Sequence, residues 1–116
     1  MRVSSRKLNE SLKKQIKNSF AQVLTDIKST EEMEKFLSGF LTPSEYEILS
    51  KRVAVAYWLK KGRSYENIKN NLKVSSATVA SVQSNIEKPS YQKALKIIEA
   101  EEWANVWVEK IKKIVS

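Results

Sequence analysis

Basic side chains are the residues of this chain most able to bind another molecule. The 116 residues include 21 Lys and Arg against 13 Asp and Glu, a formal net charge of +8. This excess favours a polyanionic partner such as nucleic acid or an acidic membrane surface. Residues 51–73 have a local balance of +6, which fits either a phosphate-binding surface or a solvated basic face. The candidate phosphate contacts are Lys60, Lys61, Arg63, Lys69 and Lys73.

Other kinds of chemistry have little support in the composition. Cys and His are both absent, which excludes thiolate or imidazole metal sites and catalysis that needs either residue. Asp26 is the only Asp, and no two carboxylates stand out as an acid/base pair. No run of about 18 apolar residues occurs, and residues 1–10 lack the apolar core of a secretory signal. We therefore expect a cytoplasmic, non-enzymatic protein with no metal, no cofactor and no membrane partner.

The segment 64–86 has the spacing of two short helices joined by a turn. Ser64 is a good N-cap, and Ile68 and Leu72 follow it on one helical face. Ser75 can cap a second helix after the interruption. This pattern predicts a helix-turn-helix and makes DNA binding the leading hypothesis, although two packed helices also occur in all-α domains without that function. The buried face of the second helix is marked by Val79, Val82 and Ile86.

The second helix of this pair has no basic side chain with which to recognise bases. There is no Lys or Arg between Val74 and Ile86, so this helix cannot read guanine through a bidentate cation. Hydroxyl and amide groups could bond base edges or phosphates, and alanines could contact thymine methyl groups. Water-mediated or shape readout also fits. The candidate reader residues are Ser75, Ser76, Ala77, Thr78, Ala80, Ser81, Gln83 and Asn85.

The rest of the chain predicts more helices and almost no strand. Apolar residues at steps of three and four indicate a long amphipathic helix over 8–27. Ser29 and Glu32 form a capping box that opens a short helix. A third helix, 43–61, begins with Thr42 as its N-cap and is closed by Gly62. The fold class is therefore all-α.

Helix 43–61 has a wider apolar surface than one neighbouring helix can cover, which favours a central or subunit-interface position. A C-terminal helix over 90–115 is expected after the interruption at Pro89. It carries Trp103 and Trp107, which we expect to pack against the body or a partner. One domain over residues 1–116 is the expected organisation.

Four short segments, taken together, resemble the Trp repressor superfamily. They are LTPSE at 41–45, LSKRV at 49–53, IKNNL at 68–72 and ATV at 77–79, within a similar region of roughly residues 30–87. The likeness is greatest to the Trp-repressor-like branch that has no established corepressor. It implies a helical bundle that forms an intertwined homodimer and presents two recognition helices to successive major grooves. By position, it implies DNA contacts for Ser76, Ala77, Ala80 and Lys69.

The same resemblance allows a comparison with the tryptophan pocket of the family. Thr42 and Arg52 correspond to two residues of the family's tryptophan pocket. Where the family has an Arg that covers the indole and then a Gly, this chain has Ser81 and Val82. The stacking cation is absent and bulk is added, so L-tryptophan is not expected as a corepressor.

These observations predict a sequence-specific transcriptional regulator, a repressor that binds double-stranded DNA as a homodimer. The alternatives are a non-catalytic interaction or assembly protein that reuses the fold, with the C-terminal helix as its binding surface, and a nonspecific nucleic-acid binder.

Overall fold

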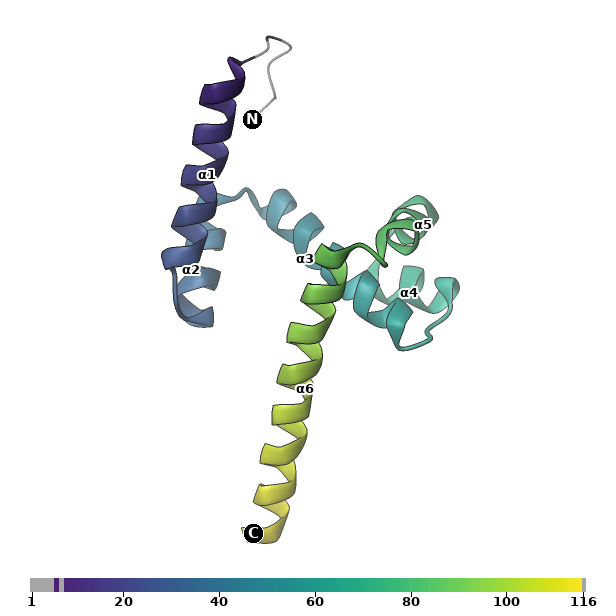
Figure 1. Ribbon diagram of the computed structural model, residues 1–116. Coiled ribbons are helices and arrows are strands. Elements are labelled where there is room, and N and C mark those ends of the chain that lie inside the picture. Colours follow the sequence, from purple (N-terminus) through teal and green to yellow (C-terminus); the bar gives the residue numbers. More distant parts are fainter. Residues whose placement is uncertain (1–5, 7, 116) are drawn as a thin grey trace. The chain divides into compact units, whose positions relative to one another are not determined.

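A computed structural model describes residues 6 and 8–115, and the side chains of residues 6, 8–102 and 105. The described residues form helices and no strand (Figure 1), which confirms the all-α prediction. None of these helices is both long and apolar enough to span a membrane. The chain divides into two compact units, Met1–Pro43 and Ser44–Ser116, and the expectation of a single domain stays a prediction. The helices are α1 Glu10–Asp26, α2 Thr30–Phe40, α3 Pro43–Lys60, α4 Tyr65–Leu72, α5 Ser76–Asn85 and α6 Pro89–Val115.

In the first unit, local capping sets where α1 and α2 begin. The side chain of Asn9 accepts hydrogen bonds from the backbone N–H groups of Ser11 and Leu12 at 2.8 and 3.3 Å, so α1 begins at Glu10. Ser29 Oγ accepts from the backbone N–H of Glu32 at 3.1 Å, as the capping box predicts. Each cap satisfies backbone donors that have no partner inside the helix.

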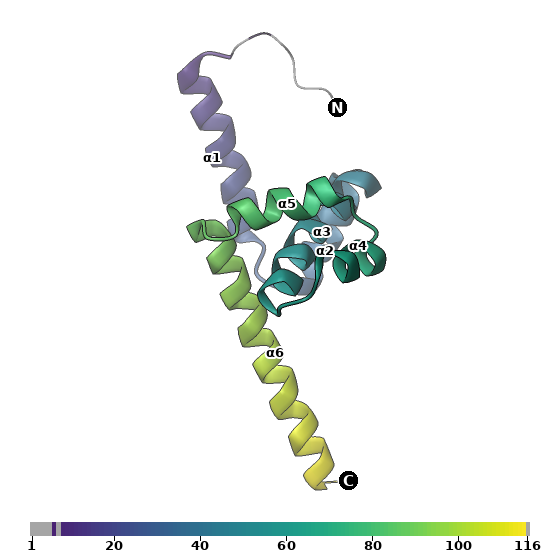
Figure 2. The same ribbon diagram turned by 90° about the vertical axis from the view of Figure 1, so that its right-hand side faces the viewer.

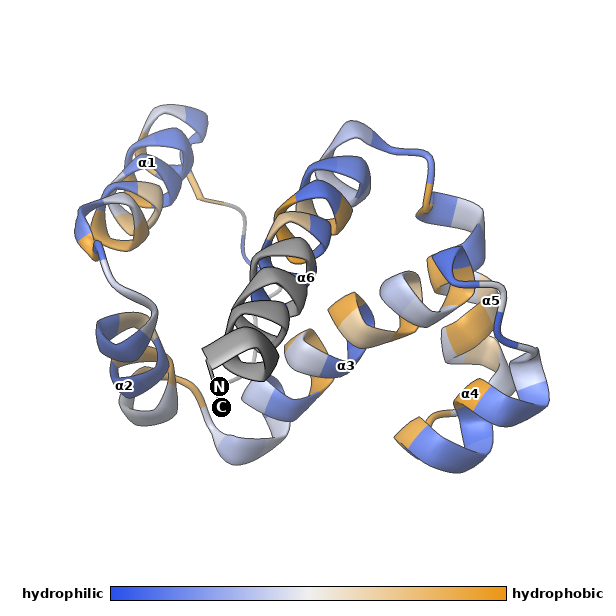
Figure 3. Cartoon of the chain, turned by 90° about the horizontal axis from the view of Figure 1, so that it is seen from below, coloured by the Kyte–Doolittle hydropathy of each residue, from blue (hydrophilic) through white to orange (hydrophobic). Residues whose placement is uncertain are grey.

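The apolar side chains of the first unit are poorly covered. The Phe36 and Phe40 rings stack with centroids 5.1 Å apart, and Phe20 and Phe40 stack at 6.1 Å. No residue of α1 or α2 is buried, and Figure 3 shows hydrophobic segments on both helices. The apolar stripe of α1 is therefore only partly covered within this unit. Its exposed members are Leu12, Ile16, Phe20 and Val23, and the exposed Leu8 lies just before the helix.

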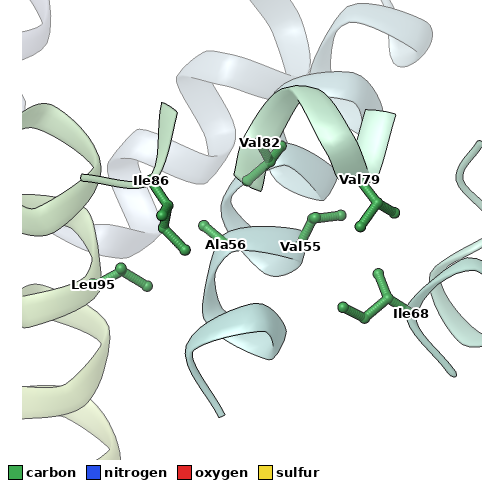
Figure 4. Packing of buried hydrophobic residues seen from close by; sticks show 7 residues of the cluster. All are labelled: Val55, Ala56, Ile68, Val79, Val82, Ile86 and Leu95. Atoms are coloured by element: carbon green, nitrogen blue, oxygen red, sulfur yellow. The ribbon is translucent and has the colours of Figure 1, made fainter. Parts of the chain in front are cut away.

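The second unit is built around one apolar cluster that joins all four of its helices (Figure 4). Val74, in the turn between α4 and α5, is half-buried and packs against it. Burying each large aliphatic side chain contributes about 1.5–3 kcal/mol, so the cluster fixes how these helices pack. Its buried members are Val55, Ala56, Ile68, Val79, Val82, Ile86 and Leu95.

Helix α3 buries only part of its wide apolar surface. Val55 and Ala56 are buried in the cluster, whereas Ile48, Leu49 and Val53 are 59%, 45% and 40% exposed. The helix ends at Lys60, and Gly62 follows with φ of 81°. This left-handed conformation is the one that favours Gly after a helix end. The N-terminal two-thirds of α3 thus present an apolar face that the unit itself does not cover.

Helix α6 begins earlier than the sequence predicts. Pro89 is the first residue of α6 and not a break that precedes this helix. The fixed φ of proline suits the first helical position. Gln92 Nε2 donates to the backbone carbonyl of Ile86 at 2.7 Å, which ties α6 to the end of α5. The side chains of Trp103 and Trp107 lie outside the described residues.

Charged and polar contacts also hold α6 against the end of α3. Lys60 Nζ lies 2.6 Å from Glu99 Oε1, and Lys61 Nζ lies 3.2 Å from Glu102 Oε2. The hydroxyl of Tyr57 donates to Glu102 Oε2. Hydrogen bonds from Tyr57 and Lys61 lower the pKa of Glu102, and the bond to Glu102 raises the pKa of Lys61.

This cluster should make stability depend on pH in a defined direction. Because the pKa of Glu102 is lower in the folded chain, its contribution to the free energy of unfolding is present at neutral pH and disappears as pH falls through that pKa. The contribution of Lys61, whose pKa is raised, disappears as pH rises through its own folded pKa. We expect Glu102→Gln to lower the unfolding temperature slightly at neutral pH, with the difference vanishing once the pH falls below the lowered pKa of Glu102.

Thermal unfolding of wild type and variant across this pH range measures the effect. Glu101→Gln makes the same change on the exposed neighbouring residue, for which no ion pair is described. An equal, pH-dependent loss in both variants would contradict the assignment to Glu102.

Candidate nucleic-acid interface

Helices α4 and α5 form where the sequence predicts a pair of helices. Ser64 Oγ accepts from the backbone N–H of Asn67, and Ser75 Oγ accepts from that of Thr78, both at 3.1 Å. Ile68 of α4 and Val79 of α5 are fully buried against α3 (Figure 4). Capping thus sets the start of each helix, and burial sets which face of α5 points inward.

The outer face of α5 is small and polar. Figure 2 shows α5 along the outside of the packed helices α3 and α4. With Val79 and Val82 buried, rotation of α5 about its axis would expose two apolar side chains, so its outer face is fixed. The candidate reader residues that are exposed on it are Ser76, Ala77, Ala80, Ser81 and Gln83.

Three other candidate reader residues already make hydrogen bonds within the chain. Ser75 and Thr78 share a contact of 3.0 Å between their hydroxyl oxygens, in addition to the cap. Asn85 Nδ2 donates to the backbone carbonyl of Ser81 at 2.7 Å. Their polar atoms therefore shape the ends of α5, and a base contact by any of them would compete with these bonds.

The candidate phosphate contacts fall into two groups. Lys60 and Lys61 are paired with Glu99 and Glu102 of α6. Because those carboxylates lie far along the sequence, the local balance of +6 overstates the charge at the end of α3. The Arg63 guanidinium lies 5.1 Å from the centroid of the Trp58 ring. This cation–π contact does not neutralise the positive charge of Arg63.

Lys69 and Lys73 form the second group, next to the turn that precedes α5. Lys69 Nζ lies 3.6 Å from the exposed carboxylate of Glu66, a weak surface pair. Lys73 is exposed at the end of α4. Lys51 of α3, another basic residue of the segment 51–73, also contacts this turn. Its Nζ donates to the backbone carbonyl of Lys73 at 3.2 Å.

An open cavity of about 580 Å³ lies among α3, α5 and the start of α6. Arg52, Ser81 and Val82 all line it, so three of the positions that correspond to the family's tryptophan pocket lie together. Its walls carry a hydroxyl and a valine where the resemblance implies an arginine and a glycine. Thr42, the remaining pocket candidate, belongs to the first unit.

Comparison with known proteins identifies the family. The profile of the Trp repressor protein family matches residues 15–99, a longer range than the sequence motifs indicated. The uncharacterized protein YerC of Bacillus subtilis (strain 168) is 30% identical over 84 residues, which cover 71% of this chain and 80% of YerC. No solved structure matches the chain significantly. The chain belongs to the Trp repressor family and has the helical fold of its DNA-binding regulators.

Proposed function

We propose that this protein is a sequence-specific DNA-binding transcriptional regulator, a repressor that occupies its operator as a homodimer. The observation that carries this proposal is the outer face of α5, which is small, polar and fixed by burial of Val79 and Val82. A helix of this kind can approach the floor of the major groove closely. The net charge of +8 supports a polyanionic partner.

In this proposal α5 enters the major groove as the recognition helix. Ser76, Ala77 and Ala80 face the base edges, and the N-terminus of α5 adds the favourable end of the helix dipole near phosphates. Lys69 and Lys73 supply phosphate contacts, with Arg63 at the margin. Lys60 and Lys61 contribute less because they must first exchange a carboxylate for a phosphate. Specificity rests on hydroxyl, methyl and shape readout.

The apolar side chains left exposed support the homodimer. The stripe of α1 and the residues Ile48, Leu49 and Val53 of α3 are between 40% and 59% exposed. Exposed apolar side chains that gather on one face of a helix mark an interaction site, and a second copy of the chain supplies a matching apolar surface. A two-fold dimer would present two copies of α5 to half-sites one helical turn apart.

The proposal is tested first by binding to duplex DNA. A preferred duplex selected from a random pool should bind more tightly than an unrelated duplex of equal length, and affinity for both should fall steeply with salt. Lys69→Ala and Lys73→Asn should each weaken both complexes and lower the salt slope by about one unit, because one phosphate fewer is neutralised. Asn replaces Lys73 because it tolerates the positive φ of that residue.

Lys96→Ala, an exposed lysine on α6, is the control and should leave affinity and slope nearly unchanged. Binding without sequence preference would support the nonspecific alternative. No salt-dependent binding at all would support an assembly protein, for which α6 is the natural surface because it extends beyond the other helices of its unit (Figure 1).

The dimer is tested by its mass in solution. Light scattering at micromolar concentration should give twice the chain mass of 13.3 kDa. Leu49→Glu should yield a monomer that keeps its helical content, because Leu49 is 45% exposed and lies outside the buried cluster. Ser84→Glu places the same side chain on exposed α5 and should stay dimeric. A monomeric wild type would overturn this part of the proposal.

L-tryptophan should have no effect on this regulator. Ser81 offers no planar cation to stack on an indole, and Val82 fills space on the cavity wall. Calorimetry with millimolar L-tryptophan should show no saturable heat, and DNA affinity should be unchanged by it. A tenfold gain in DNA affinity, which equals about 1.4 kcal/mol of coupling, would contradict our interpretation of the cavity.

A further inference from the structure

The turn between α4 and α5 contains a lysine in an unusual backbone conformation. Lys73 has φ of 55° and ψ of 54°, and it is the one residue other than Gly with positive φ in the part of the chain that the structure describes. A residue with a Cβ atom enters this left-handed region at a cost. Something in the surrounding structure must therefore favour this turn over its alternatives.

Lys51 of α3 makes the contact that favours it. Its Nζ donates to the backbone carbonyl of Lys73 at 3.2 Å, across 22 residues of sequence. This carbonyl lies at the C-terminal end of α4, where carbonyls lack helical partners and the helix dipole attracts a cation. The same Nζ lies 3.2 Å from Glu47 Oε1, and the Lys51 side chain is only 30% exposed. Glu47 and the carbonyl together hold the ammonium group at the turn.

The turn determines where α5 begins. Val74 follows Lys73 and packs against the buried cluster, and Ser75 then caps α5. At the other end, the carbonyl of Ile86 accepts from Gln92 of α6. Side chains from α3 and α6 thus hold the two ends of the helix that we assign to the groove.

We propose that Lys51 is a positioning residue for the recognition helix and not a phosphate contact. This inference rests on the proposed DNA-binding function for its consequence, but the contact itself exists without DNA. The Lys51 ammonium group is already held by a carboxylate and a carbonyl, which distinguishes it from Lys73 on the exposed side of the turn.

The test replaces Lys51 by Met, which keeps most of the side-chain length and removes the donor. Amide hydrogen exchange of residues 74–76 in the DNA-free protein should accelerate by about tenfold, since local opening of the turn becomes easier. Affinity for the preferred duplex should fall by about fivefold while the salt slope stays constant, because the same number of phosphates is neutralised. Lys51→Arg, which retains a cationic donor, should keep both the exchange rate and the DNA affinity close to those of the wild type. Lys96→Met, the same substitution on exposed α6, should change neither.

Three results would overturn the proposal. Exchange in Lys51→Met equal to that in Lys96→Met would show that the contact does not hold the turn. Reduced affinity with a salt slope lower by about one unit would make Lys51 a phosphate contact. Faster exchange with unchanged affinity would confine Lys51 to a purely structural role. If the wild-type protein binds no duplex, the proposed function fails, and the exchange measurement still decides whether Lys51 holds the turn.

Discussion

The packing of Ile68 and Val79 against Val55 is the interaction on which the second unit depends. These three side chains are fully buried and come from α4, α5 and α3. They oblige α5 to turn its other face outward, and that face carries Ser76, Ala77 and Ala80. The proposed recognition surface of α5 thus follows from the burial of Val79 and Val82 on the opposite side of this short helix. A change that repacks this contact would alter the outer face even without touching it.

Electrostatics refine the surface that burial defines. Glu99 and Glu102 of α6 form ion pairs with the two lysines at the end of α3. The basic side chains without such pairs therefore lie closer to the turn before α5. Lys51 lies at the same turn but points its ammonium group at the backbone. Basic residues that look alike in the sequence therefore differ in their contacts, and we propose three roles for them: holding α6, holding the turn, and binding a phosphate.

The first unit poses a different physical requirement. Helices α1 and α2 stack three phenylalanine rings and yet bury no residue. A two-helix unit of this size covers too little apolar surface to be stable alone. The exposed apolar face of α3 also requires a partner surface. In the homodimer that we propose, apolar residues of the second copy would cover both of these surfaces.

The sequence by itself determined the features that depend on near neighbours. The caps at Ser29, Ser64 and Ser75 act on N–H groups three residues away, so their side chains alone indicate where a helix begins. Apolar spacing likewise identified Ile68, Val79 and Val82 as buried. Local motifs were also sufficient to indicate the family, over a shorter range than the one that matches.

Only the tertiary structure decided which partners the charged groups take. The pairs of Lys60 with Glu99 and of Lys51 with the carbonyl of Lys73 join residues far apart along the chain, and composition cannot distinguish them from solvated charges. It also showed that Thr78 bonds to the Ser75 cap and Asn85 to the Ser81 carbonyl, and that Pro89 is the first residue of α6. The physical reason is range: a cap acts within one turn of helix, whereas an ion pair depends on how separate helices pack.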